Sequence, residues 1–294
     1  MENLEKVIGC RPEAFCDSLV ANRPEWVTGS LSRSDTRFLF GTALEARASL
    51  AVEIGTASGF STGVLCHALN VASQAEMINS DFHVFSYDVS SSFYADQNRQ
   101  VGDATREQLS PELLKHITFR HPALASRLEQ YHGNVDIEFL LIDANHKHPW
   151  PTLDLLASLA LLKPGAVVVL HDINLPIKNS QFQAWGAKYV FDGLDLEKHV
   201  PQDDEVPNIG SFRIPEDKEQ LRGQLLKILF AHEWQTDVND DYLANLGVTH
   251  APQALASSGT ESGNAWRRVN REVLKWTGIR TIYETLRTSS RGEN

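Results

Sequence analysis

Short apolar runs alternate with segments of helical periodicity through the first two thirds of the chain. The runs cover 50–54, 82–87, 116–120, 136–142, 166–170 and 208–214. Runs this short, separated by helical segments, predict strands that are joined by helices and run mostly parallel. The sequence therefore predicts an α/β fold, a doubly wound and mostly parallel sheet with helices on both faces.

The N-terminal end has a helical pattern of its own. Helices are expected to begin at Pro12, at Pro24 and at a cap formed by Ser34 and Asp35. This predicted N-terminal extension, residues 1–49, either packs on the sheet or forms part of a substrate lid. The sequence leaves both roles open.

The C-terminal end is also expected to be helical. Helices are predicted over 216–234 and 264–287, and the Ser- and Gly-rich segment 256–263 between them reads as a linker. A predicted C-terminal extension, 216–294, thus follows the sheet-bearing domain 50–215. Two roles remain open for it, covering the active site or pairing two copies of the chain as a homodimer.

The turn after the first apolar run has the features of a nucleotide-binding site. Glu53 lies near the end of that run, and Gly55 and Gly59 follow in a strand-turn-helix pattern. Gly55 can adopt backbone angles closed to other residues, and Gly59 allows the backbone to approach a ligand closely. Ser61 and Thr62 lie at the helix start, where backbone N–H groups lack partners, so they either cap the helix or face a ligand.

The spacing of this turn discriminates between ligands. A dinucleotide fingerprint requires Gly-x-Gly-x-x-Gly, but Ala57 replaces the middle glycine here. Glu-x-Gly-x-x-x-Gly resembles the first motif of class I S-adenosylmethionine-dependent methyltransferases, whose cofactor carries ammonium and sulfonium charges and no phosphate. The resemblance implies a cofactor site that includes Glu53, Gly55, Thr56, Gly59, Ser61 and Thr62.

Composition and charge narrow the class of protein further. A hydrophobic content of 42% supports a globular chain, and the formal net charge of -11 argues against a nucleic-acid partner. No apolar run approaches the roughly 20 residues of a membrane-spanning helix. The three cysteines, Cys10, Cys16 and Cys66, form no Cys-x-x-Cys pair, which is typical of a reducing compartment. We therefore expect a cytoplasmic protein with no membrane partner.

Two further positions fit a nucleoside. Asp88 ends the second predicted strand, where an acid in nucleotide-binding folds accepts hydrogen bonds from both ribose hydroxyls. Ala123 follows the third predicted strand, whose end opens at the same edge of the sheet and is placed to contact an adenine. This second assignment rests on position alone.

The fourth and fifth apolar runs both end in polar residues. Asp143 and His146 follow the fourth run, and His171, Asp172 and Asn174 follow the fifth. Ligands of parallel sheets bind at the carboxyl ends of the strands, so these side chains are expected to share one site.

These strand ends make the resemblance more specific. The segments 142–146, 162–165 and 168–172 look like those of small-molecule and sugar O-methyltransferases, and with the first motif and Asp88 the likeness covers 50–174. It implies a seven-stranded Rossmann-like methyltransferase fold whose late strand runs antiparallel. It also implies transfer of a methyl group from S-adenosylmethionine to a hydroxyl of a small-molecule acceptor, a sugar or a natural product.

Two mechanisms can activate a hydroxyl at this edge. In the first, His146 or His171 removes the proton beside Asp143, because imidazole titrates near neutral pH. In the second, Asp143 and Asp172 bind Mg²⁺ or another divalent cation. The resemblance implies a third ligand directly after Asp172, where this chain has isoleucine. Asn174, one residue later, would point to the same side of an extended segment.

Two other functions remain open. A nicotinamide-dependent oxidoreductase shares the strand-turn-helix opening, although the missing middle glycine opposes it. A cofactor-binding or interaction protein without catalysis is compatible with the interrupted metal pattern.

Overall fold

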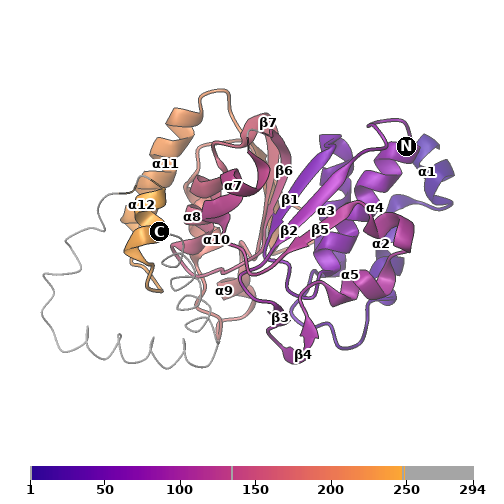
Figure 1. The fold of residues 1–294 in the computed structure, drawn as a ribbon, viewed down its shortest axis with the longest axis horizontal. Helices are drawn as coiled ribbons and strands as arrows, with labels where there is room; N and C mark the ends of the chain where they lie inside the picture. The colour runs from indigo at the N-terminus through magenta and orange to yellow at the C-terminus, as the bar shows by residue number, and fades with distance from the viewer. Residues whose placement is uncertain (1, 134, 247, 249–294) are drawn as a thin grey trace, which may run out of the picture.

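The computed structural model describes residues 2–133, 135–246 and 248 (Figure 1). Its main sheet consists of β1 (Leu50–Ile54), β2 (His83–Tyr87), β5 (Ile117–Arg120), β6 (Ile137–Ile142), β7 (Leu162–His171), β8 (Lys198–His199) and β9 (Ile209–Arg213). These seven strands lie in the order β5-β2-β1-β6-β7-β9-β8. The first five in this order are parallel, and β9 is antiparallel to both its neighbours. The predicted doubly wound, seven-stranded sheet is therefore confirmed.

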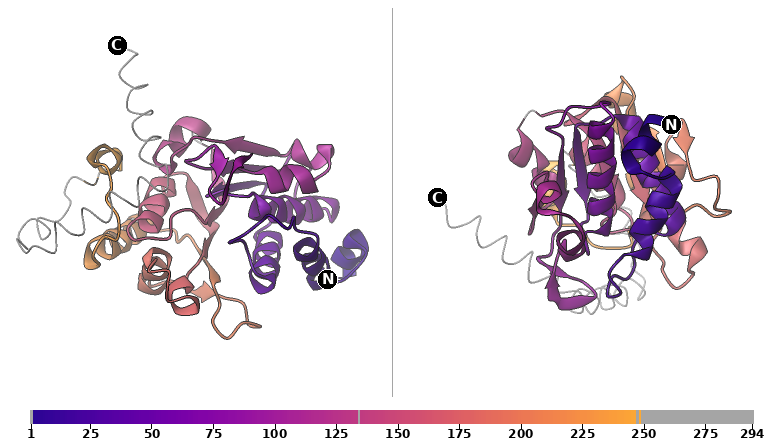
Figure 2. Two further views of the ribbon diagram at one scale, coloured as in Figure 1. Left: turned by 90° about the horizontal axis from the view of Figure 1, so that it is seen from below. Right: turned by 90° about the vertical axis from the view of Figure 1, so that its right-hand side faces the viewer.

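Helices cover both faces of this sheet (Figure 2). The larger ones are α1 (Glu2–Ile8), α2 (Pro12–Ala21), α3 (Arg33–Ala46), α4 (Phe60–Gln74), α8 (Trp150–Ser158), α10 (Gly186–Gly193) and α11 (Lys218–Ala231). The shorter ones are α5 (Asp103–Gln108), α6 (Pro111–Leu114), η1 (Ala125–Arg127), α7 (Leu128–His132), α9 (Leu175–Lys178) and α12 (Asp240–Asn245). A two-stranded hairpin, β3 (Ser92–Phe93) and β4 (Asp96–Gln100), completes the described elements.

Alternation along the central strands divides the core into two layers. In β6, Phe139 and Leu141 contribute to one buried cluster, whereas Leu140 and Ile142 contribute to the other. Successive side chains of a strand point to opposite faces, so a strand covered on both sides is apolar throughout. Helices α2, α3, α4 and α5 supply the first cluster, and α8, α10 and α11 supply the second.

The N-terminal extension packs directly against the sheet. Leu39 and Phe40 of α3 are buried in the same cluster as Ala51 of β1 and Val169 of β7. Helix α3 starts one residue before Ser34, and its N-cap is Ser32, which forms a reciprocal capping box with Asp35.

Other expected helix boundaries shift. Pro24 lies in an irregular stretch, 22–32, and starts no helix. The sequence predicts a helix over 150–162 that the Lys-Pro-Gly segment 163–165 stops. Helix α8 instead ends at Ser158, and β7 already begins at Leu162, so 163–165 belongs to a strand. The helix expected at 264–287 and the linker at 256–263 lie outside the described residues.

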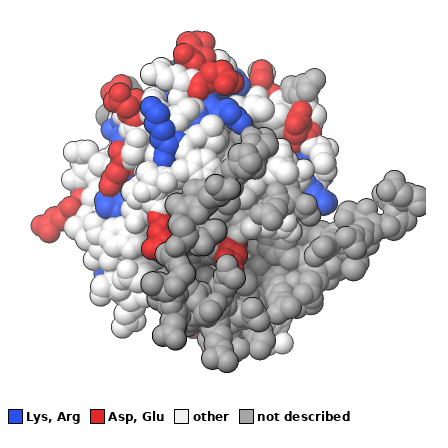
Figure 3. Space-filling view, turned by 90° about the vertical axis from the view of Figure 1, so that its left-hand side faces the viewer, with Lys and Arg blue, Asp and Glu red and all other residues white. Residues whose placement is uncertain are grey.

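The hairpin β3–β4 and the short helix α9 lie at one edge of the sheet (Figure 1). The hairpin follows β2 and α9 follows β7, so both emerge from carboxyl ends of parallel strands. On the face in Figure 3, basic and acidic side chains lie beside one another among uncharged ones. Within the described residues, no helix has the length and apolarity needed to span a membrane.

Candidate active site

The glycine turn between β1 and α4 touches the end of β6. A Cβ on Gly55, whose φ is 100°, would overlap the carbonyl oxygen of Asp143, and one on Gly59 would lie 2.5 Å from the Thr105 hydroxyl. Both glycines, and Ala57 between them, have positive φ, which favours residues without a Cβ. The turn and Asp143 therefore border the same space.

Glu53 is fully buried and binds the helix that follows the turn. Its carboxylate accepts hydrogen bonds from the hydroxyls of Ser61 (2.5 Å), Thr62 and Ser86 (2.5 Å). Burial raises the pKa of Glu53 to about 7, against the opposing effect of these hydroxyl donors. The predicted cofactor residues Glu53, Ser61 and Thr62 thus bind one another, and α4 has Gly59 as its N-cap.

Asp88, at the end of β2, faces the turn. Its Oδ2 accepts a hydrogen bond from the Ala57 N–H at 2.9 Å, and its Oδ1 accepts one from the Ser90 N–H at 2.8 Å. A carboxylate has about four acceptor positions, so two backbone bonds leave room for ribose hydroxyls. The chain also brings Ala123 here, because its N–H donates to the Asp88 carbonyl at 2.7 Å.

Thr56, the last predicted cofactor residue, is 2% exposed and contacts the Ser86 hydroxyl at 2.6 Å. Its side chain therefore belongs to the same buried hydroxyl network as Glu53.

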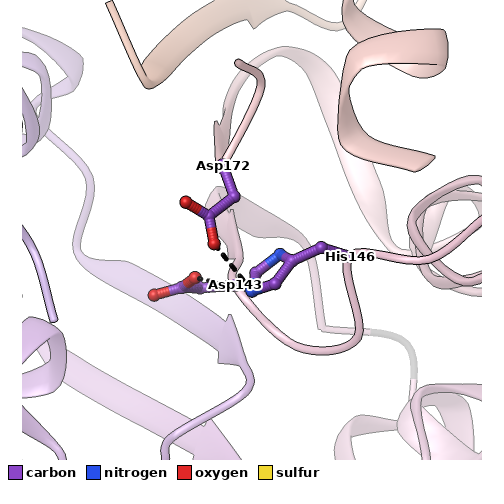
Figure 4. A group of neighbouring side chains, drawn as sticks. All are labelled: Asp143, His146 and Asp172. Atoms are coloured by element: carbon purple, nitrogen blue, oxygen red, sulfur yellow. Dashed lines mark ion pairs between the residues drawn. The ribbon is translucent and has the colours of Figure 1, made fainter. Parts of the chain in front are cut away.

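Asp143, His146 and Asp172 converge at the ends of β6 and β7 (Figure 4). His146 Nε2 lies 3.0 Å from Asp172 Oδ2 and 3.9 Å from Asp143 Oδ1. Burial favours the neutral imidazole, but the two carboxylates prevail and raise the pKa of His146. The negative charges of these two carboxylates therefore favour the protonated form of the ring.

His171 supports this group from the buried side. Its Nδ1 lies 2.8 Å from Asp143 Oδ1, and its Nε2 lies 3.6 Å from Asp35 Oδ2 on α3. Burial opposes the charged ring, yet the surrounding carboxylates hold the pKa of His171 well above its usual value. Asp35, which lies outside the predicted site, is thus a neighbour of His171.

Asn174 points away from the two aspartates. Its Nδ2 donates to the Pro207 carbonyl at 2.7 Å, and its Oδ1 accepts from Lys188 Nζ at 3.0 Å. Asn208 occupies the place beside Asp172, because its Nδ2 donates to Asp172 Oδ1 at 2.5 Å. A signal for Asn208 was present in the sequence, since an antiparallel strand that starts there begins at the edge where β7 ends.

The donor set at this edge fits a divalent cation. The candidate ligand atoms of Asp143, His146 and Asp172 all lie within 4.8 Å of one another. Two carboxylates with one imidazole suit manganese, iron or zinc as well as magnesium, which prefers oxygen ligands. The nitrogen that faces the aspartates would be the one bound to the ion, so His146 would then not accept a proton there.

These features define an α/β protein with its site at the carboxyl edge of a doubly wound sheet. Residues 52–173 match the family model described as "Methyltransferase domain". This match agrees with the resemblance found in the sequence, and it spans the strands from β1 to β7.

Solved structures of modest similarity include an O-methyltransferase from Bacillus cereus in complex with SAH, with 17% identity and a TM-score of 0.47, covering 72% of this chain and 91% of that one. TomG from Streptomyces achromogenes, an O-methyltransferase in complex with SAM, has 16% identity and a TM-score of 0.46, covering 73% and 90%. Cofactor-bound Rv0187 from MTB has 16% identity and a TM-score of 0.48, covering 71% and 92%. No curated protein matches the chain.

Proposed function

We propose that the chain transfers a methyl group from S-adenosylmethionine to a hydroxyl of a small molecule, a sugar or a natural product. The contact between the turn and the acidic group carries this proposal, because Gly55 packs against the Asp143 backbone. A nucleoside whose ribose binds Asp88 and whose chain crosses the turn would end beside Asp143 and His146.

The residues at the turn fit this cofactor. Asp88 retains acceptor positions for ribose hydroxyls after binding the Ala57 and Ser90 amides. Asp143, whose backbone packs against Gly55, supplies a carboxylate at the same strand edge for the positive charge of the cofactor. When bound, the cofactor supplies an electrophilic methyl carbon, and the task of the chain is to align the acceptor oxygen with it.

We assign His146 as the base that accepts the proton of the acceptor hydroxyl. Asp172 contacts its Nε2 at 3.0 Å, which orients the ring and stabilises the imidazolium that forms. Asp143 adds a second carboxylate at 3.9 Å. His171 holds Asp143 in place through the 2.8 Å contact at Nδ1, and is assigned a supporting role.

A metal-assisted mechanism is the second candidate, favoured by the convergence of Asp143, His146 and Asp172. In it, the two carboxylates hold a divalent cation that acidifies the acceptor hydroxyl. Asn174 would join only if it left Lys188 and Pro207. Loss of turnover after chelation, restored by added Mg²⁺ or Mn²⁺, would select this mechanism, whereas turnover that survives chelation would select His146 as sole activator.

The decisive experiment compares ligands and then turnover. Thermal unfolding with S-adenosylhomocysteine should give a concentration-dependent rise in Tm, and NAD should give none. Methyl transfer is then measured with labelled S-adenosylmethionine and a panel of hydroxylated sugars and aromatic natural products. A rise in Tm with NAD and none with S-adenosylhomocysteine would overturn the proposal in favour of an oxidoreductase. Tight S-adenosylhomocysteine binding without transfer to any acceptor in a broad panel would favour a binding protein.

A further inference from the structure

The loop that carries His146 connects β6 to α8, and other segments hold its backbone. The His146 carbonyl accepts a hydrogen bond from the Gly186 N–H at 2.8 Å. Two residues on, the His148 N–H donates to the side-chain Oε1 of Gln235 at 3.0 Å, and the His148 carbonyl accepts from the Gln235 N–H at 2.8 Å. Residues far along the chain therefore satisfy the polar groups of this loop.

Gln235 joins the loop to the segment that leads into α10. Its Oε1 also accepts from the Trp185 N–H at 2.9 Å, and its Nε2 donates to the Gln183 carbonyl at 2.6 Å. The amide orientation follows from its partners, because the opposite orientation would set its NH₂ group against two N–H donors. One side chain thus bonds both segments that flank His146.

The packing leaves this region little freedom to rearrange. A Cβ on Gly186 would lie 2.8 Å from both the His146 carbonyl oxygen and the His148 nitrogen, so the start of α10 presses against the loop. The His148 ring is fully buried, with Nε2 at 3.2 Å from the Leu229 carbonyl on α11. The loop is consequently fixed by α10, α11 and the residues after α11.

We propose that Gln235 is a positioning residue for His146. It lies 62 residues beyond the segment 52–173 that matches the family model, after the end of α11. It acts on His146 through His148 and Trp185, whose backbone N–H groups it binds. This inference rests on the proposed function, in which the geometry of His146 relative to the acceptor decides the rate.

Gln235→Met tests the proposal, since methionine keeps the length of the side chain and removes its acceptor and donor. Displacement of a catalytic group by about 1 Å can cost a factor of ~100, so kcat should fall by roughly 10- to 100-fold. The Kd of S-adenosylhomocysteine should stay within about twofold, because the cofactor contacts lie on β1, β2 and their turns. Gln235→Glu keeps the acceptor for both N–H groups and should restore most of the lost kcat.

Gln220→Met on the exposed side of α11 is the matched control and should leave kcat unchanged. Equal kcat values for the wild type and Gln235→Met would overturn the positioning role. An equal loss of kcat in Gln235→Met and Gln235→Glu would also overturn it. The oxygen that glutamate retains, and that accepts from the His148 and Trp185 N–H groups, would then have no effect on the rate.

A measurement on the wild type keeps the inference testable if the variants do not fold. The backbone amides of His148 and Trp185 should exchange with deuterium as slowly as those within α8, since both donate to Gln235. Fast exchange at both amides would overturn the positioning role of Gln235. If the wild type has protected amides but transfers no methyl group, the proposed function is contradicted. The fixation of the His146 loop by Gln235 would still hold.

Discussion

At the scale of single residues, the backbone of Asp172 is as informative as its carboxylate. Its φ is 60°, a left-handed conformation that is unfavourable for a residue with a side chain. Such strain persists only where the surroundings enforce it, and Asn208 binds one Asp172 oxygen while His146 contacts the other. The carboxylate is thereby directed at His146.

Removal of the proposed base is the first test at this scale. His146→Ala should lower kcat by a factor of ~10² to 10⁴, the usual contribution of a positioned general base. The Kd of S-adenosylhomocysteine, measured by calorimetry, should change little. His199→Ala is the control, because that side chain is 59% exposed and its partner Glu197 lies on the surface. Wild-type turnover in His146→Ala would remove His146 from the mechanism.

The pH dependence of turnover follows from the charge state of the same ring. A base must be neutral to accept a proton, and Asp172 and Asp143 raise the pKa of His146. We expect kcat/KM to rise with pH, with a midpoint above the ordinary histidine value of about 6.5. Asp172→Asn should move that midpoint to lower pH while reducing the maximal rate. A pH–rate profile with the same midpoint in both proteins would contradict this assignment.

At the scale of elements, the strand-turn-helix unit β1–α4 sets the distance between the cofactor turn and the acidic group. Gly55→Ala places a Cβ where the Asp143 carbonyl lies and strains a residue with φ of 100°. The free energy of unfolding should fall by about 2 kcal/mol or more, and cofactor affinity should fall with it. Urea unfolding and S-adenosylhomocysteine titration measure the two effects.

Gly41→Ala is the matched control for this substitution. Gly41 lies inside α3, and beyond the backbone of its own helix a new Cβ there would meet no atom within 4 Å. Alanine favours a helix over glycine by up to ~1 kcal/mol, so this variant should be as stable as the wild type or more stable. Similar losses in both variants would mean that the Asp143 contact at Gly55 has no special weight.

Most of the helices and strands could be predicted from the sequence, but some of their boundaries could not. The strands and the turn were predictable, because apolar runs and Gly55 reflect local requirements of the fold. Pro24 was misread because proline permits a helix start without requiring one. The misassignment at 163–165 has a different cause. Leu162 pairs with Ile137 of β6, and the Gly165 N–H donates to the Ile214 carbonyl just after β9. These tertiary contacts carry the strand through a Lys-Pro-Gly segment that reads locally as a helix stop.

Some residues of the candidate site could likewise be predicted from the sequence, and others could not. Asp143, His146, His171 and Asp172 follow apolar runs, so their meeting at one edge could be predicted from the strand order. Asp35 and Gln235 could not, because each reaches the site from a helix or segment whose own pattern carries no mark of it. Their contribution depends on how α3 and α11 pack against the sheet.

At the scale of the whole molecule, the candidate site depends on parts that lie outside the segment 52–173 that matches the family model. Asp35 approaches His171 from the helical layer on one face, and Gln235 approaches the His146 loop after α11 on the other face. Both helical layers therefore support one candidate site. Stability measured for the whole chain should accordingly respond to charges buried between the sheet and these layers.

Glu53 is the clearest such charge. Its pKa of about 7 in the folded protein exceeds the ordinary value of 4.5, so the folded state holds the proton more tightly. The stability it contributes is present below pH 4.5 and is lost as pH rises to about 7. Glu53→Gln removes this dependence. Relative to the wild type, the variant should gain stability between pH 4.5 and 7, by at most about 3 kcal/mol in urea unfolding.

Glu138 provides a comparison of opposite sign. Burial raises its pKa, but the ammonium of Lys163 and the amides of Ser49 and Leu50 hold it below the ordinary value. Its stabilising effect is therefore present above the unfolded pKa and is lost as pH falls. Glu138→Gln should lose stability near neutral pH and approach the wild type in acid, so its difference from the wild type runs opposite to that of Glu53→Gln. Parallel pH trends in the two variants would show that burial of Glu53 does not control its protonation.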